Sequence, residues 1–345
     1  MQQERNSSIE ILRILAMLGI VIMHTNGSVM EHSVGWNQIW TQIENGIFNA
    51  GVSVFVLISG YFGIRCSKKK LIDLEMSVIF YAVVSAVIGH FLNGESLLQI
   101  LKAFIPVSTN CYWFMTCYIL LMLFAPYLNY AIDSMNKKQF TRLLMSMVLV
   151  FVVAPTVLYY SVLGGGKNVI NMLLLYFLGA YIKKYNYCNK FTNVLLIKIF
   201  CLTALANIVL NLFVSMLAGG KAHIPFARDC SAFIMIEATA LLMLFLKHKF
   251  YSETVNKIAK HVFAVYLFEG AVRQAILNIA FDYSFYEGKW CWPIINIMIA
   301  LVALILCMLI DVIVQRFLEF PRRSALVAVE YAEKKIDCMV ERWRD

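Results

Sequence analysis

Long apolar stretches alternate with short polar or basic segments along almost the whole chain. A membrane-spanning helix needs about 20 predominantly apolar residues, and the pattern predicts ten such helices. They lie near residues 9–27, 47–64, 74–92, 111–130, 142–161, 168–184, 191–217, 229–247, 258–280 and 291–315. We therefore expect an all-α integral membrane protein, folded as a bundle of about ten transmembrane helices.

Lysine and arginine residues gather in every second connection between these helices. If the N-terminus lies inside, the cytoplasmic segments hold 23 of them and the outer segments hold five. Cytoplasmic loops carry such an excess, so both termini are predicted to be cytoplasmic and the segment Ser28–Gly46 to be an outer loop. We expect a membrane-embedded domain over residues 1–316 and a charged cytoplasmic tail over residues 317–345, which resembles a helix lying on the membrane.

The composition supports a membrane protein and limits the kinds of partner. Of the 345 residues, 61% are hydrophobic and only 15% are charged, whereas a soluble protein has about 25% charged residues. The formal charge of +9 follows the basic connections, so the lipid bilayer is the expected partner and nucleic acid is not. The nine cysteines are scattered without a CxxC pair, so we expect neither a disulfide framework nor a metal site. The first apolar run lacks a cleavage site and is predicted to be a retained span.

The first predicted helix carries three ionisable residues, Glu10, Arg13 and His24. At about 100° per residue they fall within an arc of about 60°, on one stripe of the helix. Ionisable groups inside a span usually face the bundle interior and mark a functional path. Each residue also has an ordinary explanation. Ser7 and Glu10 match a capping box, Arg13 lies near enough to the interface to extend its charge to water, and His24 could be a mere interfacial histidine.

Four segments resemble the membrane-bound acyltransferase 3 family. Arg5-x4-Glu10-x2-Arg13 followed by His24 is similar to the opening of that family. The other three are GVSVFVLISGYFGIR (Gly51–Arg65), WFMTCYILLMLFAPYLN (Trp113–Asn129) and AVYLFEGAVR (Ala264–Arg273). Together they span the first, second, fourth and ninth expected helices, and so most of the length of the chain. The sequence departs from the pattern at Glu269, where many members carry histidine.

The resemblance implies a polysaccharide or glycan O-acetyltransferase. Such a protein moves an acyl group from cytoplasmic acetyl-CoA, or another acyl-CoA, to a hydroxyl of a sugar or glycan, which is often lipid-linked. It would be a multi-pass protein of the cell membrane, in a bacterium the cytoplasmic membrane. We expect His24, Glu10 and Arg13 to be catalytic. His24 would act as general base or accept the acyl group itself, and Arg13 would hold the donor or stabilise oxyanion charge.

Further residues are candidates for binding the two substrates. The basic cluster Arg65, Lys68 and Lys69 follows the second span and suits the phosphates of CoA, although an ordinary topology signal would look the same. Trp113 and Tyr118 suit a sugar ring, or belong to an interfacial aromatic belt. Glu269 and Arg273 are four residues apart and can pair on one helix face, either to position a substrate or as a structural ion pair.

A transporter or flippase for a glycolipid or polysaccharide precursor is the alternative function. It would also use intramembrane charges and many helices, but it predicts internal repeats and paired broken helices. The sequence shows neither clearly. A structural or sensing membrane protein leaves the stripe of the first helix unexplained, so the sequence favours the acyltransferase.

Overall fold

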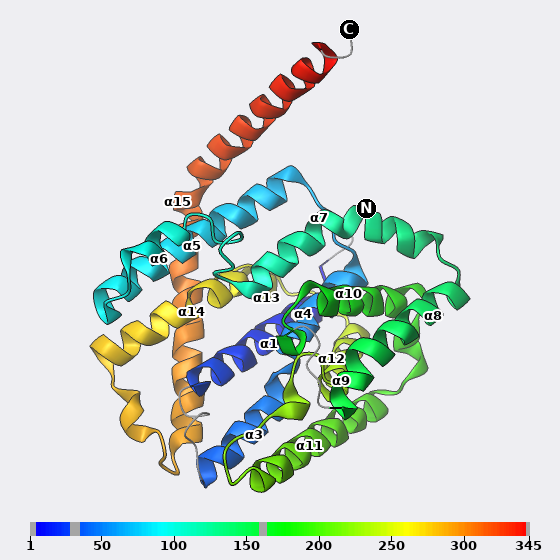
Figure 1. Cartoon of the computed structure of the whole chain (residues 1–345), viewed down its shortest axis with the longest axis vertical. Coiled ribbons are helices and arrows are strands. Elements are labelled where there is room, and N and C mark those ends of the chain that lie inside the picture. The colour runs from blue at the N-terminus through cyan, green and yellow to red at the C-terminus, as the bar shows by residue number, and fades with distance from the viewer. Residues whose placement is uncertain (1–4, 28–34, 159–163, 343–345) are drawn as a thin grey trace.

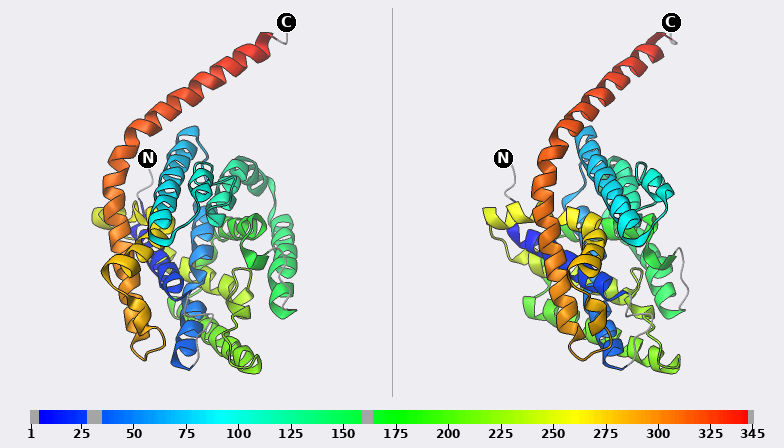
Figure 2. Two further views of the ribbon diagram at one scale, coloured as in Figure 1. Left: turned by 60° about the vertical axis from the view of Figure 1, so that its left-hand side comes forward. Right: turned by 90° about the vertical axis from the view of Figure 1, so that its left-hand side faces the viewer.

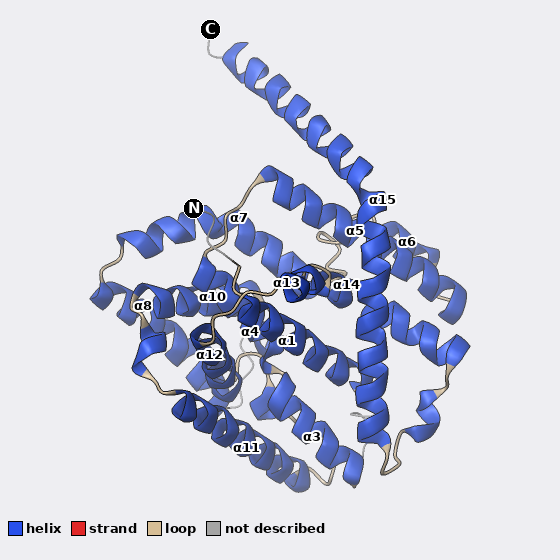
Figure 3. Ribbon diagram, turned by 180° about the vertical axis from the view of Figure 1, so that it is seen from behind, coloured by secondary structure: helices blue, strands red, loops and turns tan. Residues whose placement is uncertain are grey.

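The computed structural model describes residues 5–27, 35–158 and 164–342. Within these ranges every regular element is a helix and no strand occurs, as Figure 3 shows. The expected all-α architecture is therefore confirmed for the described part of the chain.

Eight helical segments are long and apolar enough to cross a membrane. They are α1 (Ser7–Thr25), α3 and α4 together (Trp36–Phe62), α5 (Lys68–Asn93), α7 (Trp113–Ser134), α8 to α9 (Lys137–Val157), α11 (Asn193–Leu217), α14 with its following turn (Val262–Ala280), and Trp292–Ile336 of α15. The chain is thus a multi-pass membrane protein. Two further expected spans, α10 (Val169–Lys184) and α12 (Ala232–Lys247), have 16 residues each, about 24 Å at the helical rise. They lie among the other helices (Figure 1), so the count of ten stays a prediction.

The expected outer loop Ser28–Gly46 is wrong over its second half. Residues 28–34 lie outside the described part, but α3 (Trp36–Phe48) is a helix that leads directly into α4 (Ala50–Phe62). Its polar side chains lower the hydropathy of the segment, so a hydropathy pattern does not reveal the helix. Two of these side chains form hydrogen bonds inside the bundle. Asn26 donates to Glu44 Oε1 at 2.6 Å, and Gln42 donates to Ser215 Oγ at 3.0 Å.

The last helix continues far beyond the last expected span. α15 runs from Trp292 to Arg342, 51 residues, with Pro321 inside it. Its final turns project away from the bundle, as Figures 1 and 2 show. The boundary expected after residue 316 therefore falls within one helix. The charged tail extends that helix, and its Glu333 pairs with Lys68 at the start of α5.

The basic segments that the sequence assigns to one side of the membrane do meet at one end of the bundle, here called the basic end. The remaining connections meet at the opposite end. At the basic end, hydrogen bonds and ion pairs join Ser7 to Asn256, Asn129 to Ile64, Lys184 to Met135 and Lys68 to Glu333. At the opposite end, hydrogen bonds join Gln38 to Gly220 and Arg228 to Pro155. The alternation of the segments follows the prediction, while the assignment of the basic end to the cytoplasm stays a prediction.

Two glycines let α4 and α10 approach closely at the centre of the bundle. A Cβ atom on Gly60 would lie 2.1 Å from the Tyr176 carbonyl oxygen, and one on Gly179 would lie 2.3 Å from the Leu57 carbonyl oxygen. Close packing of this kind is what small residues permit in membrane proteins. It fixes α4, which forms one wall of the cavity described next.

Candidate active site

A cavity of about 510 Å³ lies between α1, α4, α7 and α14, and we call it the central cavity. Its polar lining consists mainly of Arg5, Arg13, His24, Asn49, Lys167, Asp229 and Lys260, and its aromatic lining of Phe55, Trp113, Phe114, Tyr118, Phe263 and Tyr266. Arg13 and His24, expected on one stripe of the first helix, thus face one space. Trp113 and Tyr118, the candidate sugar-binding residues, face the same space.

His24 forms a relay with two residues of α14 (Val262–Ala275). Its Nδ1 lies 2.8 Å from Glu269 Oε1, and Arg273 Nε donates to Glu269 Oε2 at 2.5 Å. The Glu269 side chain is 8% exposed, whereas that of His24 is 46% exposed and borders the cavity. With a proton on Nδ1, the imidazole donates to the carboxylate and keeps the lone pair of Nε2 for another partner. The expected pairing of Glu269 with Arg273 is present, and its carboxylate also orients a histidine.

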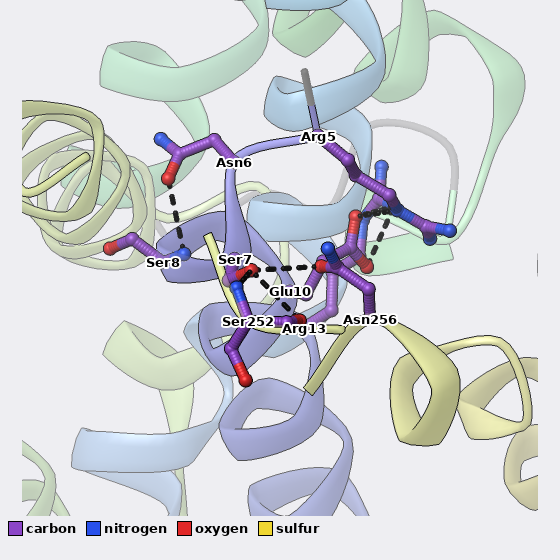
Figure 4. Close-up of polar contacts among 8 residues, drawn as sticks. All are labelled: Arg5, Asn6, Ser7, Ser8, Glu10, Arg13, Ser252 and Asn256. Carbon is purple, nitrogen blue, oxygen red and sulfur yellow. Dashed lines mark hydrogen bonds and ion pairs between the residues drawn. The ribbon is translucent and has the colours of Figure 1, made fainter. Parts of the chain in front are cut away.

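Glu10 holds two arginines at the start of α1, as Figure 4 shows. Its Oε1 accepts from Arg5 Nε at 2.7 Å and from Arg13 Nη1 at 3.1 Å. The alternative explanation of Glu10 by a capping box is wrong, because Asn6 caps the helix by accepting from the Ser8 amide. Ser7 Oγ instead donates to Asn256 at 3.0 Å. Glu10 is therefore placed to orient guanidinium groups and contributes no cap.

A second cavity of about 740 Å³ opens at the basic end, and we call it the basic vestibule. It shares Arg5 and Arg13 with the central cavity. Its other lining residues are Asn6, Ile9, Glu10, Tyr61, Phe62, Leu246, Lys249, Phe250 and Tyr251. The two arginines therefore border both cavities.

Aromatic side chains form the middle of the central cavity. Phe114 and Tyr118 stack with ring centroids 5.7 Å apart, and Tyr266 meets Phe114 edge to face at 5.6 Å. The Tyr118 hydroxyl lies 3.1 Å from Ser59 Oγ on α4. These contacts join three helices around a mostly apolar space, as is usual for pockets that bind small organic molecules.

A different group of residues lines the cavity at the opposite end of the bundle. The Lys167 ammonium lies 5.9 Å from the centre of the Trp113 ring. Asp229, in the loop before α12, borders the same space. The cavity thus has cationic groups at one end and a mixed set, with an indole ring, at the other.

Comparison with known proteins identifies the type of protein that has this arrangement. A family model described as an acyltransferase domain matches residues 6–312. The chain belongs to the acyltransferase 3 family. No curated protein and no solved structure matched the chain in the same comparisons. The match covers the His24 relay and every lining residue of the two cavities except Arg5, so the family resemblance seen in four segments extends over nearly the whole chain.

The basic cluster after α4 lies away from the central cavity of this acyltransferase. Arg65 is exposed, Lys68 pairs with Glu333, and Lys69 borders a separate cavity of about 390 Å³ between α5 and α15. The expected binding of the donor by this cluster therefore gains no support from the geometry. The lysines and arginines that border the two cavities are Arg5, Arg13, Lys167, Lys249 and Lys260.

The sequence pattern missed several residues that line the acyltransferase cavities. Arg5 belongs to the family motif of the first helix, and that membership is the one signal that could have found it. Lys249 and Lys260 look like ordinary basic loop residues, and Asp229 looks like a polar residue at the start of a span. Among the described residues, no group of three His, Cys, Asp or Glu side chains could hold a metal ion.

Proposed function

We propose that this acyltransferase moves an acetyl group from acetyl-CoA to a hydroxyl of a sugar or glycan precursor, with His24 as general base. The observation that supports this role is the contact of His24 Nδ1 with the buried carboxylate of Glu269. A carboxylate in this position fixes the orientation of the imidazole and stabilises the imidazolium that forms when Nε2 takes a proton.

The reaction needs one base and one stabiliser of negative charge. Nε2 of His24 takes the proton of the acceptor hydroxyl while its oxygen attacks the thioester carbonyl carbon. The carbonyl oxygen becomes an oxyanion, which a hydrogen-bond donor of the cavity wall can stabilise. The C–S bond then breaks, the new C–O bond remains as the ester, and the proton on Nε2 passes to the thiolate of CoA. Atoms, charge and protons balance without a metal or further reactant.

The donor enters through the basic vestibule in this proposal. CoA carries several phosphate charges, and Arg5, Arg13 and Lys249 border the vestibule. Guanidinium groups suit phosphate oxygens because they present several donors in a plane. Glu10 keeps two of these guanidinium groups in place. The slender pantetheine arm would pass Arg13 into the aromatic part of the central cavity and bring the thioester to His24.

The acceptor approaches from the opposite end. His24 lies in the last turn of α1 and Trp113 is the first residue of α7, so both lie near that end. With the basic end in the cytoplasm of a bacterial cell, an acceptor for the cell envelope would meet His24 from the outer side. This arrangement lets a cytoplasmic donor serve an extracytoplasmic sugar through a single site.

The experiment uses the full chain in lipid nanodiscs with radiolabelled acetyl-CoA and a glycan acceptor fraction. Donor binding and transfer of label to the acceptor are measured separately. We expect His24→Ala to bind acetyl-CoA as the wild type does and to lose transfer by about 10²- to 10⁴-fold, the usual contribution of a general base. His24→Gln should not restore transfer, because glutamine cannot cycle a proton.

His223→Ala is the matched control, since His223 lies in a loop and does not border either cavity. It should keep both binding and transfer. Near wild-type transfer by His24→Ala would remove the proposed base. Failure of the wild type to bind acetyl-CoA or any other acyl-CoA would remove the donor assignment.

A further inference from the structure

Asp229 is a buried carboxylate whose nearest opposing charge is the Lys167 ammonium, and no described residue donates a hydrogen bond to it. The residue is 6% exposed and borders the central cavity. Within the described ranges its carboxylate oxygens make no hydrogen bond or ion pair, and only its backbone carbonyl accepts, from Asn171 Nδ2 at 3.2 Å. A buried carboxylate is costly unless it is paired. Such a group at a cavity wall is therefore suited to a ligand.

The backbone around Asp229 is fixed by close contacts. The Cys230 amide donates to the Gly165 carbonyl at 3.2 Å. A Cβ atom on Gly166 would lie 2.5 Å from the Cys230 nitrogen and 3.0 Å from the Asp229 Cβ. The loop before α10 thus presses directly on the Asp229 backbone. The backbone that carries the carboxylate is consequently held at the wall of the cavity.

The groups near this carboxylate in the cavity wall suit hydroxyl groups. Lys167 belongs to the loop that packs on Asp229, and its ammonium lies over the Trp113 ring at 5.9 Å. A hydroxyl can donate to a carboxylate and accept from an ammonium at once. The indole ring offers an apolar face to the C–H side of a sugar ring.

We propose that Asp229, Lys167 and Trp113 form the acceptor subsite, and that it takes an uncharged sugar unit with adjacent hydroxyl groups. This assignment rests on the proposed acyl transfer and names the substrate class of that same site. The donor is excluded from the subsite because its phosphates would meet the carboxylate. An amino sugar is disfavoured because Arg13, Lys167 and Lys260 already border the cavity. Asp229 and Lys167 together carry no net charge, which matches an uncharged ligand.

The test measures sugar binding directly, with the full chain in nanodiscs. Methyl β-D-glucopyranoside and methyl β-D-galactopyranoside serve as uncharged probes, and methyl β-D-glucosaminide serves as the cationic probe. Saturation-transfer NMR gives the affinity of each, and a parallel titration gives the affinity of acetyl-CoA. Asp229→Asn keeps the shape and removes the charge, so it should fold at least as well as the wild type. Asp282→Asn, an exposed carboxylate of a loop outside the cavity, is the control.

We expect at least one uncharged probe to bind the wild type and the Asp282→Asn variant alike. The Asp229→Asn variant should bind it about tenfold more weakly, as expected for loss of a hydrogen bond to a charged group. Lys167→Met should weaken the same probe, and neither change should alter acetyl-CoA affinity. Equal binding by Asp229→Asn, no binding of either uncharged probe to the wild type, or tighter binding of the glucosaminide would each overturn the subsite.

Failure of the subsite and failure of acyl transfer are distinguishable in this design. If the wild type binds acetyl-CoA and acetylates a glycan in a His24-dependent manner while Asp229→Asn keeps its KM for that glycan, only the subsite is wrong. If the wild type transfers no acyl group to any glycan, the proposed function itself is wrong.

Discussion

The imidazole of His24 meets the carboxylate of Glu269 at 2.8 Å, although 245 residues separate the two in the sequence. The contact joins the end of α1 to the middle of α14. Arg273 holds the other carboxylate oxygen from the next turn of α14. A histidine that looks isolated in the sequence is thus the end of a three-residue relay, and it borders the central cavity of a chain that belongs to the acyltransferase 3 family.

Glu269→Gln should separate two roles of this carboxylate, which are to orient the His24 imidazole and to stabilise the imidazolium by its charge. The amide can still accept a hydrogen bond from Nδ1, but it cannot stabilise the imidazolium. We expect kcat to fall about 100-fold, within the range for general-base assistance, while KM for acetyl-CoA stays the same. Initial rates at varied acetyl-CoA measure both constants. Glu95→Gln, in an exposed segment, should behave as the wild type, and unchanged kcat in Glu269→Gln would argue against the relay.

Glu10→Gln should weaken donor binding with a smaller effect on the chemical step. The change frees Arg5 and Arg13 from the shared carboxylate, so neither guanidinium keeps its orientation at the wall of the two cavities. We expect affinity for acetyl-CoA to fall about tenfold, equivalent to about 1.4 kcal/mol. Isothermal titration measures it directly.

A double-mutant cycle with Arg13→Lys tests whether Glu10 acts through Arg13. Residues in contact show non-additive effects, so the double variant should bind donor about as weakly as Arg13→Lys alone. Strictly additive losses would mean that Glu10 affects the donor without orienting Arg13.

Gly60→Ala should destabilise the fold, although Gly60 itself lines neither cavity. Its new Cβ would lie 2.1 Å from a carbonyl oxygen of α10, so the two central helices must separate. Overpacking of this kind costs about 1–3 kcal/mol. Gly270→Ala is the matched control, because a Cβ there meets nothing within 4 Å. Thermal unfolding in detergent should show a lower Tm for Gly60→Ala alone, and equal Tm values for the two variants would contradict the close approach.

The pH dependence of stability should report the buried carboxyl of Asp229. Burial raises its pKa to about 6, above the value near 3.9 of a solvated aspartate. The folded state therefore favours the protonated form. The contribution of this carboxyl to the free energy of unfolding is fully present below about pH 4. It is lost as the pH rises through 6, and the total loss is about 3 kcal/mol.

Asp229→Asn does not titrate, so its stability should exceed that of the wild type by a growing margin from pH 4 to 6 and a constant margin above. Thermal unfolding of both proteins in detergent between pH 4 and 8 measures the margin. A margin independent of pH would mean that the carboxyl is solvated in the folded protein.

The sequence predicted the features that depend on local spacing. The charged stripe of α1, the pairing of Glu269 with Arg273, and the family follow from residues a few positions apart. The contact of Glu269 with His24 could not be predicted, because it depends on the packing of two distant helices. Hydropathy also missed α3, whose Gln42 and Glu44 side chains form hydrogen bonds inside the bundle.

Basic residues were the least predictable part of the candidate site. Lys68 and Lys69 stand in the densest basic cluster of the sequence, yet Lys68 pairs with the tail helix and Lys69 faces another cavity. Lys260 stands in an ordinary connection and borders the central cavity. Charge density along a chain reports membrane topology as readily as ligand binding, and only the fold separates the two.

The long sequence separation within the relay also sets a delay during synthesis. Arg13 meets its partner Glu10 within one helical turn, so that pair is complete as soon as α1 forms. His24 must wait until residue 269 has been made, 245 residues later. At about 5–20 residues per second, the ribosome needs roughly 12 to 50 s for that length. The catalytic candidate therefore spends most of the translation time in the membrane without its carboxylate, and the relay is among the last parts of the protein to assemble.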